Sequence, residues 1–181
     1  MSSLITEPRV AAQTWRLVAL ALAEPSTESL GFLREQSENY PILRPALAEL
    51  ERLPLEAWQG EHTRLFSFPA LCPPFASAFL EDGILNGHRA ADLEQFYQEY
   101  GLAAIGLPAD YLGTICECAA YLEEEDPEMA WIFGRDALGD WLPDFSERLQ
   151  QLSELLLYRE LGRILETEIL AVLWTGSEAM K

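Results

Sequence analysis

The chain has 181 residues, of which 49% are hydrophobic, and its formal net charge at pH 7 is −18. A chain of this length suits one domain that buries roughly 70% of its unfolded surface, and the composition excludes an intrinsically disordered protein. The negative charge argues against nucleic acid as a partner, because the phosphates would repel it, and it permits a basic partner or serves solubility alone.

The cysteines and the N-terminal region indicate a cytoplasmic protein. Three cysteines do not make a disulfide framework, and Cys116 and Cys118 point to different faces of the helix that we expect there. Arg16 and the apolar run 17–23 resemble a short signal peptide, but Glu7 lies in the part that should be basic. The run is also far shorter than the roughly 20 residues of a membrane span, so we expect an ordinary first helix and no stable membrane insertion.

Prolines and potential caps divide the first part of the chain into four helices. The first helix ends before Pro25, and Ser26 is a suitable N-cap for the second, which extends toward Glu38. Pro41 and Pro54 are well placed to open the third and fourth helices.

Residues 61–79 (EHTRLFSFPALCPPFASAF) begin as the end of the fourth helix, whose apolar face includes Leu65 and Phe66. Pro69, Pro73 and Pro74 then remove backbone donors, so no regular helix continues through them. The segment stays rich in phenylalanine. We expect a proline-rich loop that either plugs the core or lines a groove for an apolar ligand.

The next helices are predicted from apolar spacing. One covers residues 92–100 and ends at Gly101, and another starts near Pro108. The second of these carries an apolar stripe for the core and, on another face, a stripe that is polar and acidic: Asp110, Thr114, Glu117 and Tyr121. We place Asp110 in the first turn, where the helix dipole favours a carboxylate.

Three further helices complete the chain. Asp126 is expected to cap one, an apolar ladder runs over 142–156, and the last covers 161–173. No alternating strand pattern, repeat or linker is found. The sequence therefore predicts an all-α fold, a single domain over residues 1–181 with about eight to ten helices and a proline-rich loop.

Patterns for catalysis or metal binding are weak. His62 and His88 with the three cysteines lack zinc-ligand spacing, and the acidic run 123–126 fits solvated carboxylates better than an acid/base pair. No nucleotide or hydrolase motif appears, and Ser77 has no obvious base. We predict that the protein is not an enzyme and holds no metal or cofactor.

Three motifs carry a family resemblance. Residues 61–66 (EHTRLF), followed by 73–77 (PPFAS), match the pattern E-x-x-x-L-F … P-P-[WY]-x-S except that Phe75 takes the place of Trp or Tyr. Residues 108–111 (PADY) are similar to P-x-D-H, and residues 133–145 (FGRDALGDWLPDF) to F-x-R-x-H-L-x-x-W-x-P-x-F. Together they resemble the TorD/DmsD/NarJ family of redox-enzyme maturation chaperones. Tyr111 and Ala137 stand where that family commonly has histidine.

The resemblance implies a cytoplasmic chaperone, monomeric or homodimeric, for the precursor of a molybdenum-cofactor oxidoreductase. Such a chaperone holds its client, often through a twin-arginine signal peptide, and assists cofactor insertion before export or assembly. A twin-arginine peptide joins two cations to an apolar run, which suits an acidic stripe beside a proline-rich loop. The predicted signal-peptide site is Glu61, His62, Leu65, Phe66, Pro73, Pro74, Phe75, Ser77, Pro108, Asp110, Tyr111 and Glu117.

Simpler interpretations stay open for several of these residues. Leu65 and Phe66 fit the core of a helical protein equally well. Asp110 fits a favourable acid at a helix start, and Glu117 fits an ordinary solvated acid. The alternative function is that of a helical scaffold or regulatory protein, which binds a folded partner and ignores signal peptides.

Overall fold

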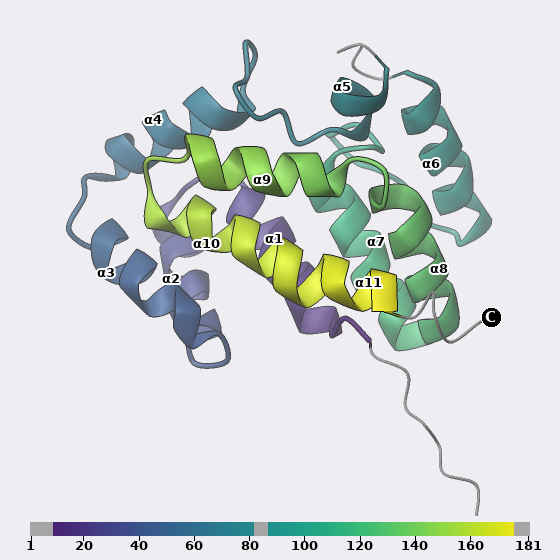
Figure 1. The fold of residues 1–181 in the computed structure, drawn as a ribbon, viewed down its shortest axis with the longest axis horizontal. Coiled ribbons are helices and arrows are strands. Elements are labelled where there is room, and N and C mark those ends of the chain that lie inside the picture. Colours follow the sequence, from purple (N-terminus) through teal and green to yellow (C-terminus); the bar gives the residue numbers. More distant parts are fainter. Residues whose placement is uncertain (1–8, 82–86, 176–181) are drawn as a thin grey trace, which may run out of the picture.

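The computed structural model describes residues 9–81 and 87–175, and its regular elements in those residues are all helical (Figure 1). There are ten described helices when elements that follow one another directly, η1 with α3 and α10 with η2 and α11, are each counted as one. The all-α prediction is confirmed. The predicted domain, residues 1–181, extends beyond the described residues. The elements are α1 (Ala12–Leu22), α2 (Thr27–Gln36), η1 (Pro41–Leu43), α3 (Arg44–Leu50), α4 (Leu55–Phe66), α5 (Ala76–Leu80), α6 (His88–Glu99), α7 (Leu112–Glu125), α8 (Pro127–Leu138), α9 (Leu142–Leu152), α10 (Leu156–Ile164), η2 (Leu165–Leu170) and α11 (Ala171–Thr175).

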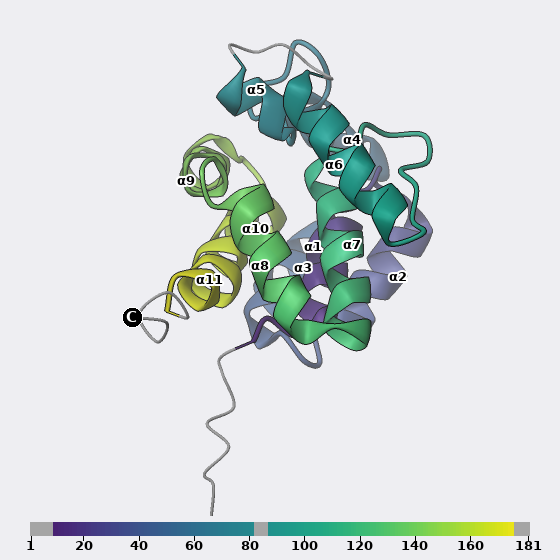
Figure 2. The same cartoon turned by 90° about the vertical axis from the view of Figure 1, so that its right-hand side faces the viewer.

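Helix α1 is the centre of the packing. Its apolar side chains, among them Trp15, Leu17 and Val18, are buried. The helix lies along α7 and also packs against α2 and α10, and Figure 2 shows α1 and α7 side by side. Most of the apolar run that resembles a signal peptide is therefore part of the core.

Several helix starts follow the expected local signals. Ser26 caps α2, because its side chain accepts a 3.0 Å hydrogen bond from the Ser29 N–H. Asp126 caps α8 in the same way, with the Met129 N–H at 3.2 Å. Pro54 directly precedes α4, as predicted.

Several predicted helix boundaries are wrong: the helix predicted from residue 92 starts at His88, and the last helix starts at Leu156 rather than at residue 161. Two further errors have a clear cause in the structure. Helix α7 begins at Leu112 rather than near Pro108, because the backbone around Asp110 pairs with the proline-rich loop instead. The ladder predicted over 142–156 is broken at Ser153, whose backbone is extended, with a ψ angle of 132°. Helix α9 consequently ends at Leu152, and α10 starts separately at Leu156.

The proline-rich stretch contains a short helix that was not predicted. Helix α5 starts just after Pro73 and Pro74, in the sequence ASAFL, which holds no helix breaker. Before α5, the Cys72 N–H donates to the Leu65 carbonyl at 2.8 Å, which folds the loop back onto the end of α4.

The last described helix is continuous from Leu156 to Thr175, although η2 is a π-helical turn within it. Helix α9 packs closely on this helix at Gly162. None of the helices in residues 9–81 and 87–175 is both long and apolar enough to cross a membrane.

Candidate functional site

Glu61 is a buried carboxylate that joins α4 to the segment between α9 and α10. Its Oε2 lies 2.7 Å from Nε of Arg64, and its Oε1 accepts the Glu154 N–H at 2.7 Å. Burial alone would raise the pKa of Glu61, but these hydrogen bonds outweigh it and hold the pKa below its ordinary value. Only 7% of the residue is exposed, so its role in this structure is to connect elements.

Leu65 and Phe66 both lie in the core. Leu65 is fully buried, and the Phe66 ring packs edge-to-face on the rings of His62 and Tyr158, with centroid distances of 5.1 Å to each. Tyr158 in turn accepts a hydrogen bond from the Trp58 indole N–H at 3.0 Å. The end of α4 is thus held on α10 by an aromatic cluster.

His62 and Tyr111 converge on one backbone atom at the end of α1. The Leu22 carbonyl oxygen lies 3.0 Å from Nε2 of His62 and accepts the Tyr111 hydroxyl at 3.0 Å. This carbonyl belongs to the last turn of α1, where it has no partner within the helix. Burial raises the pKa of Tyr111, so its phenol stays protonated and can donate at neutral pH.

Asp110 and Ser77 fasten the proline-rich loop to the segment before α7. Both residues are completely buried, and Oδ2 of Asp110 accepts the Ser77 N–H at 2.8 Å as well as the Ser77 hydroxyl. Phe75 and Tyr111 form an isolated antiparallel bridge, with ring centroids 5.5 Å apart. The expectation that Asp110 is part of an accessible acidic stripe is wrong, because its carboxylate faces the loop inside the protein.

The other predicted residues of the loop surround this connection. Pro74 is buried and accepts the Leu112 N–H at 2.8 Å, whereas Pro73 and Phe75 are half-buried. Pro108 is half-buried and starts a turn that ends at Tyr111. Their assignment to signal-peptide contact stays a prediction.

The remaining members of the polar stripe line an open groove. Thr114 and Glu117 of α7 line two adjoining hollows, of about 290 Å³ and 130 Å³, and Tyr121 lines the smaller one. The larger hollow is bounded by Ala19, Ala23, Ala103, Ala104, Ile105, Leu107, Tyr111, Gly113, Thr114 and Glu117. The smaller hollow is bounded by Tyr97, Leu102, Ala103, Thr114, Glu117, Cys118 and Tyr121. We call the two hollows together the α7 groove.

Loop 102–107 forms one wall of the α7 groove, and the sequence analysis missed it. Gly101 and Gly106 have φ angles of 70° and 77°, which other residues rarely adopt, so the glycines fix the bends of this loop. Between and beyond them, Ile105 is 90% exposed and Leu107 is 50% exposed. An apolar run punctuated by glycines, which ends four residues before a helix, is the signal that could have identified this wall.

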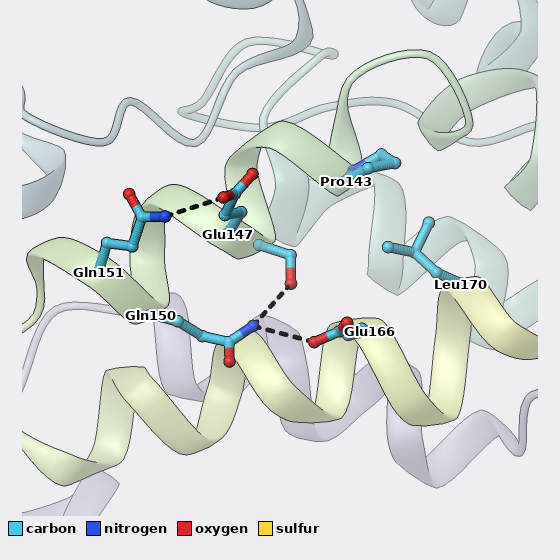
Figure 3. Close-up of a pocket in the computed structure, with 7 residues that line it drawn as sticks. Pro143, Glu147, Gln150, Gln151, Glu166 and Leu170 are labelled. Carbon is cyan, nitrogen blue, oxygen red and sulfur yellow. Dashed lines mark hydrogen bonds between the residues drawn. The ribbon is translucent and has the colours of Figure 1, made fainter.

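A further hollow of about 470 Å³ lies between α9 and η2 (Figure 3). Its polar side chains bond to one another, with Gln150 donating to Glu166 at 3.2 Å and Gln151 donating to Glu147 at 2.8 Å. None of the predicted site residues lines this hollow. We therefore place the candidate site at the α7 groove, where predicted residues and exposed apolar side chains meet.

All three cysteines are buried free thiols. No cluster of three metal-ligating side chains occurs in residues 9–81 and 87–175. Burial raises the pKa of Cys72 and of Cys118 to about 12, so both thiols are protonated at neutral pH.

Comparisons with known proteins agree with the fold. The profile of the nitrate reductase delta subunit family matches residues 30–152. A crystal structure of a candidate redox enzyme maturation protein from Archaeoglobus fulgidus is similar, with a TM-score of 0.68 and 24% identity over 92% of this chain and 100% of that one. At this identity the likeness shows the fold alone. No curated protein matches the sequence. Because the family profile covers more than half of the chain, the protein belongs to the nitrate reductase delta subunit family, the NarJ/TorD type of chaperone that its motifs resemble.

Proposed function

We propose that the protein is a chaperone for the precursor of a molybdenum-cofactor oxidoreductase and binds the signal peptide of that precursor in the α7 groove. Family membership supports the chaperone role and the class of client. The observation that carries peptide binding is the groove itself, in which Glu117 lies among exposed apolar side chains such as Ile105 and Leu107.

The chemistry of the groove suits a twin-arginine signal peptide. Its apolar wall can bury the hydrophobic part of the peptide, at about 25 cal/mol per Å² of apolar surface. Glu117 and the net charge of −18 attract the basic part and orient it. Apolar burial supplies most of the affinity in this proposal, and charge supplies orientation and association rate.

Six of the predicted site residues fall into two groups under this proposal. Tyr111 and Glu117 line the groove and contact the peptide. Four others do not line the groove but hold α4, the end of α1 and the proline-rich loop in place: Glu61, His62, Asp110 and Ser77. Holding the client in the cytoplasm until its cofactor is inserted is the further step that the family suggests.

Calorimetric titration tests the proposal with synthetic leaders of the oxidoreductases encoded by the same organism. We expect at least one leader to bind with a dissociation constant near 1 µM, about −8 kcal/mol. Ile105→Ser should weaken this binding by more than about 1 kcal/mol, because it removes an exposed apolar contact.

Phe68→Ser is the matched control, since Phe68 is also apolar and 91% exposed but lies on the loop after α4, outside the groove. It should leave the peptide affinity unchanged. If no leader binds, while a folded oxidoreductase subunit does, the protein is instead a scaffold that does not recognise signal peptides.

A further inference from the structure

Glu117 lies at the junction of the two hollows of the α7 groove. Ala103, Thr114 and Glu117 line both hollows, so a peptide that passes from one hollow to the other crosses directly over them. Glu117 is also the single charged residue among the residues that line either hollow. A cation above this junction would therefore be flanked by an apolar side chain in each hollow.

The acidic residues nearest in sequence do not add a second carboxylate to the groove. Asp110 is buried and holds Ser77, and Glu123 and Glu124 lie beside Arg9 and Arg16 at distances of 4.0 Å and 2.7 Å. Glu24 follows Ala23 but lines neither hollow. A peptide with two adjacent arginines would thus find a single carboxylate among the lining residues, which is enough for one of the two.

The two hollows differ in the side chains that they can take. Half of the residues that line the larger hollow, of about 290 Å³, are alanine or glycine, among them Ala19, Ala23 and Ala104. The smaller hollow, of about 130 Å³, is bounded by the bulkier Tyr97, Leu102 and Tyr121. A large apolar side chain therefore suits the hollow beside α1, and a small one suits the hollow beside Tyr121.

We propose that the α7 groove recognises one basic side chain on Glu117, with a large apolar side chain in the α1-side hollow and a small one in the other hollow. This inference rests on the proposed function that the groove binds a signal peptide, and it specifies which side chains of the peptide the groove recognises. In a twin-arginine pair, one arginine contacts Glu117 and the other faces no lining carboxylate.

Fluorescence anisotropy with four labelled peptides tests whether the groove recognises one basic side chain. The peptides share one apolar sequence and carry Arg-Arg, Arg-Ala, Ala-Arg or Ala-Ala at the basic pair. We expect one single-arginine peptide to bind within about twofold of the Arg-Arg peptide and the other to bind about three- to fivefold more weakly, as for one partly exposed ion pair.

The Glu117→Gln variant should remove the difference between the two single-arginine peptides. Glu166→Gln is the control, because it deletes one glutamate charge in the hollow between α9 and η2 (Figure 3) and should preserve the difference. The inference would be overturned if both single-arginine peptides lost the same amount of affinity relative to the Arg-Arg peptide. It would also be overturned if the two still differed in affinity for the Glu117→Gln variant. If even the Arg-Arg peptide fails to bind, the proposed function fails instead.

A second pair of variants tests the apolar hollows. Ala23→Leu narrows the larger hollow and should weaken a peptide with phenylalanine at its large apolar position about tenfold, while a peptide with alanine there is spared. Ala48→Leu, an exposed change on α3, should affect neither peptide. Equal effects of Ala23→Leu on both peptides would contradict the assignment of that hollow, and unfolding midpoints of the variants would verify that each is folded.

Discussion

Asp110 shows how burial changes the meaning of an acidic residue. In the sequence it looks like a favourable carboxylate at a helix start, and in the structure it accepts both the N–H and the hydroxyl of Ser77, which lies 33 positions earlier. Replacing either partner would leave the other buried without its hydrogen bonds, which costs more than the bond itself contributes.

We therefore predict that Asp110→Ala and Ser77→Ala each lower the free energy of unfolding by about 1–3 kcal/mol. The loss of unfolding free energy in the double variant should be clearly smaller than the sum of the losses in the two single variants, because both changes break the same connection. Urea unfolding of the three variants measures this. Strictly additive losses would mean that the two side chains act independently.

Glu61 predicts a dependence of stability on pH. Its pKa in the folded protein is lowered from the ordinary 4.5, so its contribution is complete above about pH 4.5 and is lost as the pH falls through the lowered value. Glu61→Gln should cost about 1–3 kcal/mol at pH 7 and should flatten the loss of stability between pH 4.5 and more acidic values.

Unfolding midpoints at pH 7 and across the acid range would measure the effect of Glu61→Gln. Glu94→Gln, an exposed change in the middle of α6, serves as the control and should follow the wild type at every pH. A Glu61→Gln variant with the wild-type acid profile would contradict the role that we assign to this carboxylate.

At the scale of the elements, the contact between α9 and α10 depends on Gly162. A Cβ added there would lie 2.6 Å from Cγ of Gln150 and 3.0 Å from the Ser146 carbonyl oxygen, so α9 would have to move. Gly162→Ala should destabilise the protein by about 1–3 kcal/mol despite its better helix propensity.

Gly31→Ala on α2 is the matched change, because no atom lies within 4 Å of its added Cβ. It should stabilise the protein by about 0.5–1 kcal/mol through helix propensity alone. Thermal unfolding of both variants compares them directly. The same sign of change in both would show that α9 and α10 have room to adjust.

The helices themselves were largely predictable, since apolar period, prolines and caps act locally. Ser26 and Asp126 cap the helices that they were expected to cap. The errors come from contacts between distant segments. The start of α7 is set by pairing with the proline-rich loop, and no local pattern shows this.

The candidate site was predictable in part, for a similar reason. Glu117 and Tyr111 line the groove, and both were predicted from the stripe and the motif. Ile105 and Leu107 were missed because their exposure depends on how loop 102–107 lies over α7. Leu65 and Phe66 belong to the core, an alternative that helical spacing leaves open.

At the scale of the whole molecule, the net charge of −18 should govern the rate of peptide association. Raising the salt concentration from about 50 to 500 mM shortens the Debye length from roughly 14 to 4 Å. We expect the association rate constant to fall by more than the dissociation rate constant rises, because steering acts before contact. Stopped-flow mixing measures both, and a salt-independent association rate would assign the acidity to solubility alone.

The central position of α1 has a consequence during synthesis of the protein on the ribosome. Helix α7, which covers α1, starts 90 residues after α1 ends. At a translation rate of about 5–20 residues per second, roughly 5–20 s pass between the synthesis of α1 and that of α7, and during this time α7 cannot yet bury the apolar face of α1. During this interval the nascent chain displays a basic residue followed by an apolar run, Arg16 and residues 17–23, to any factor that surveys emerging proteins for such segments.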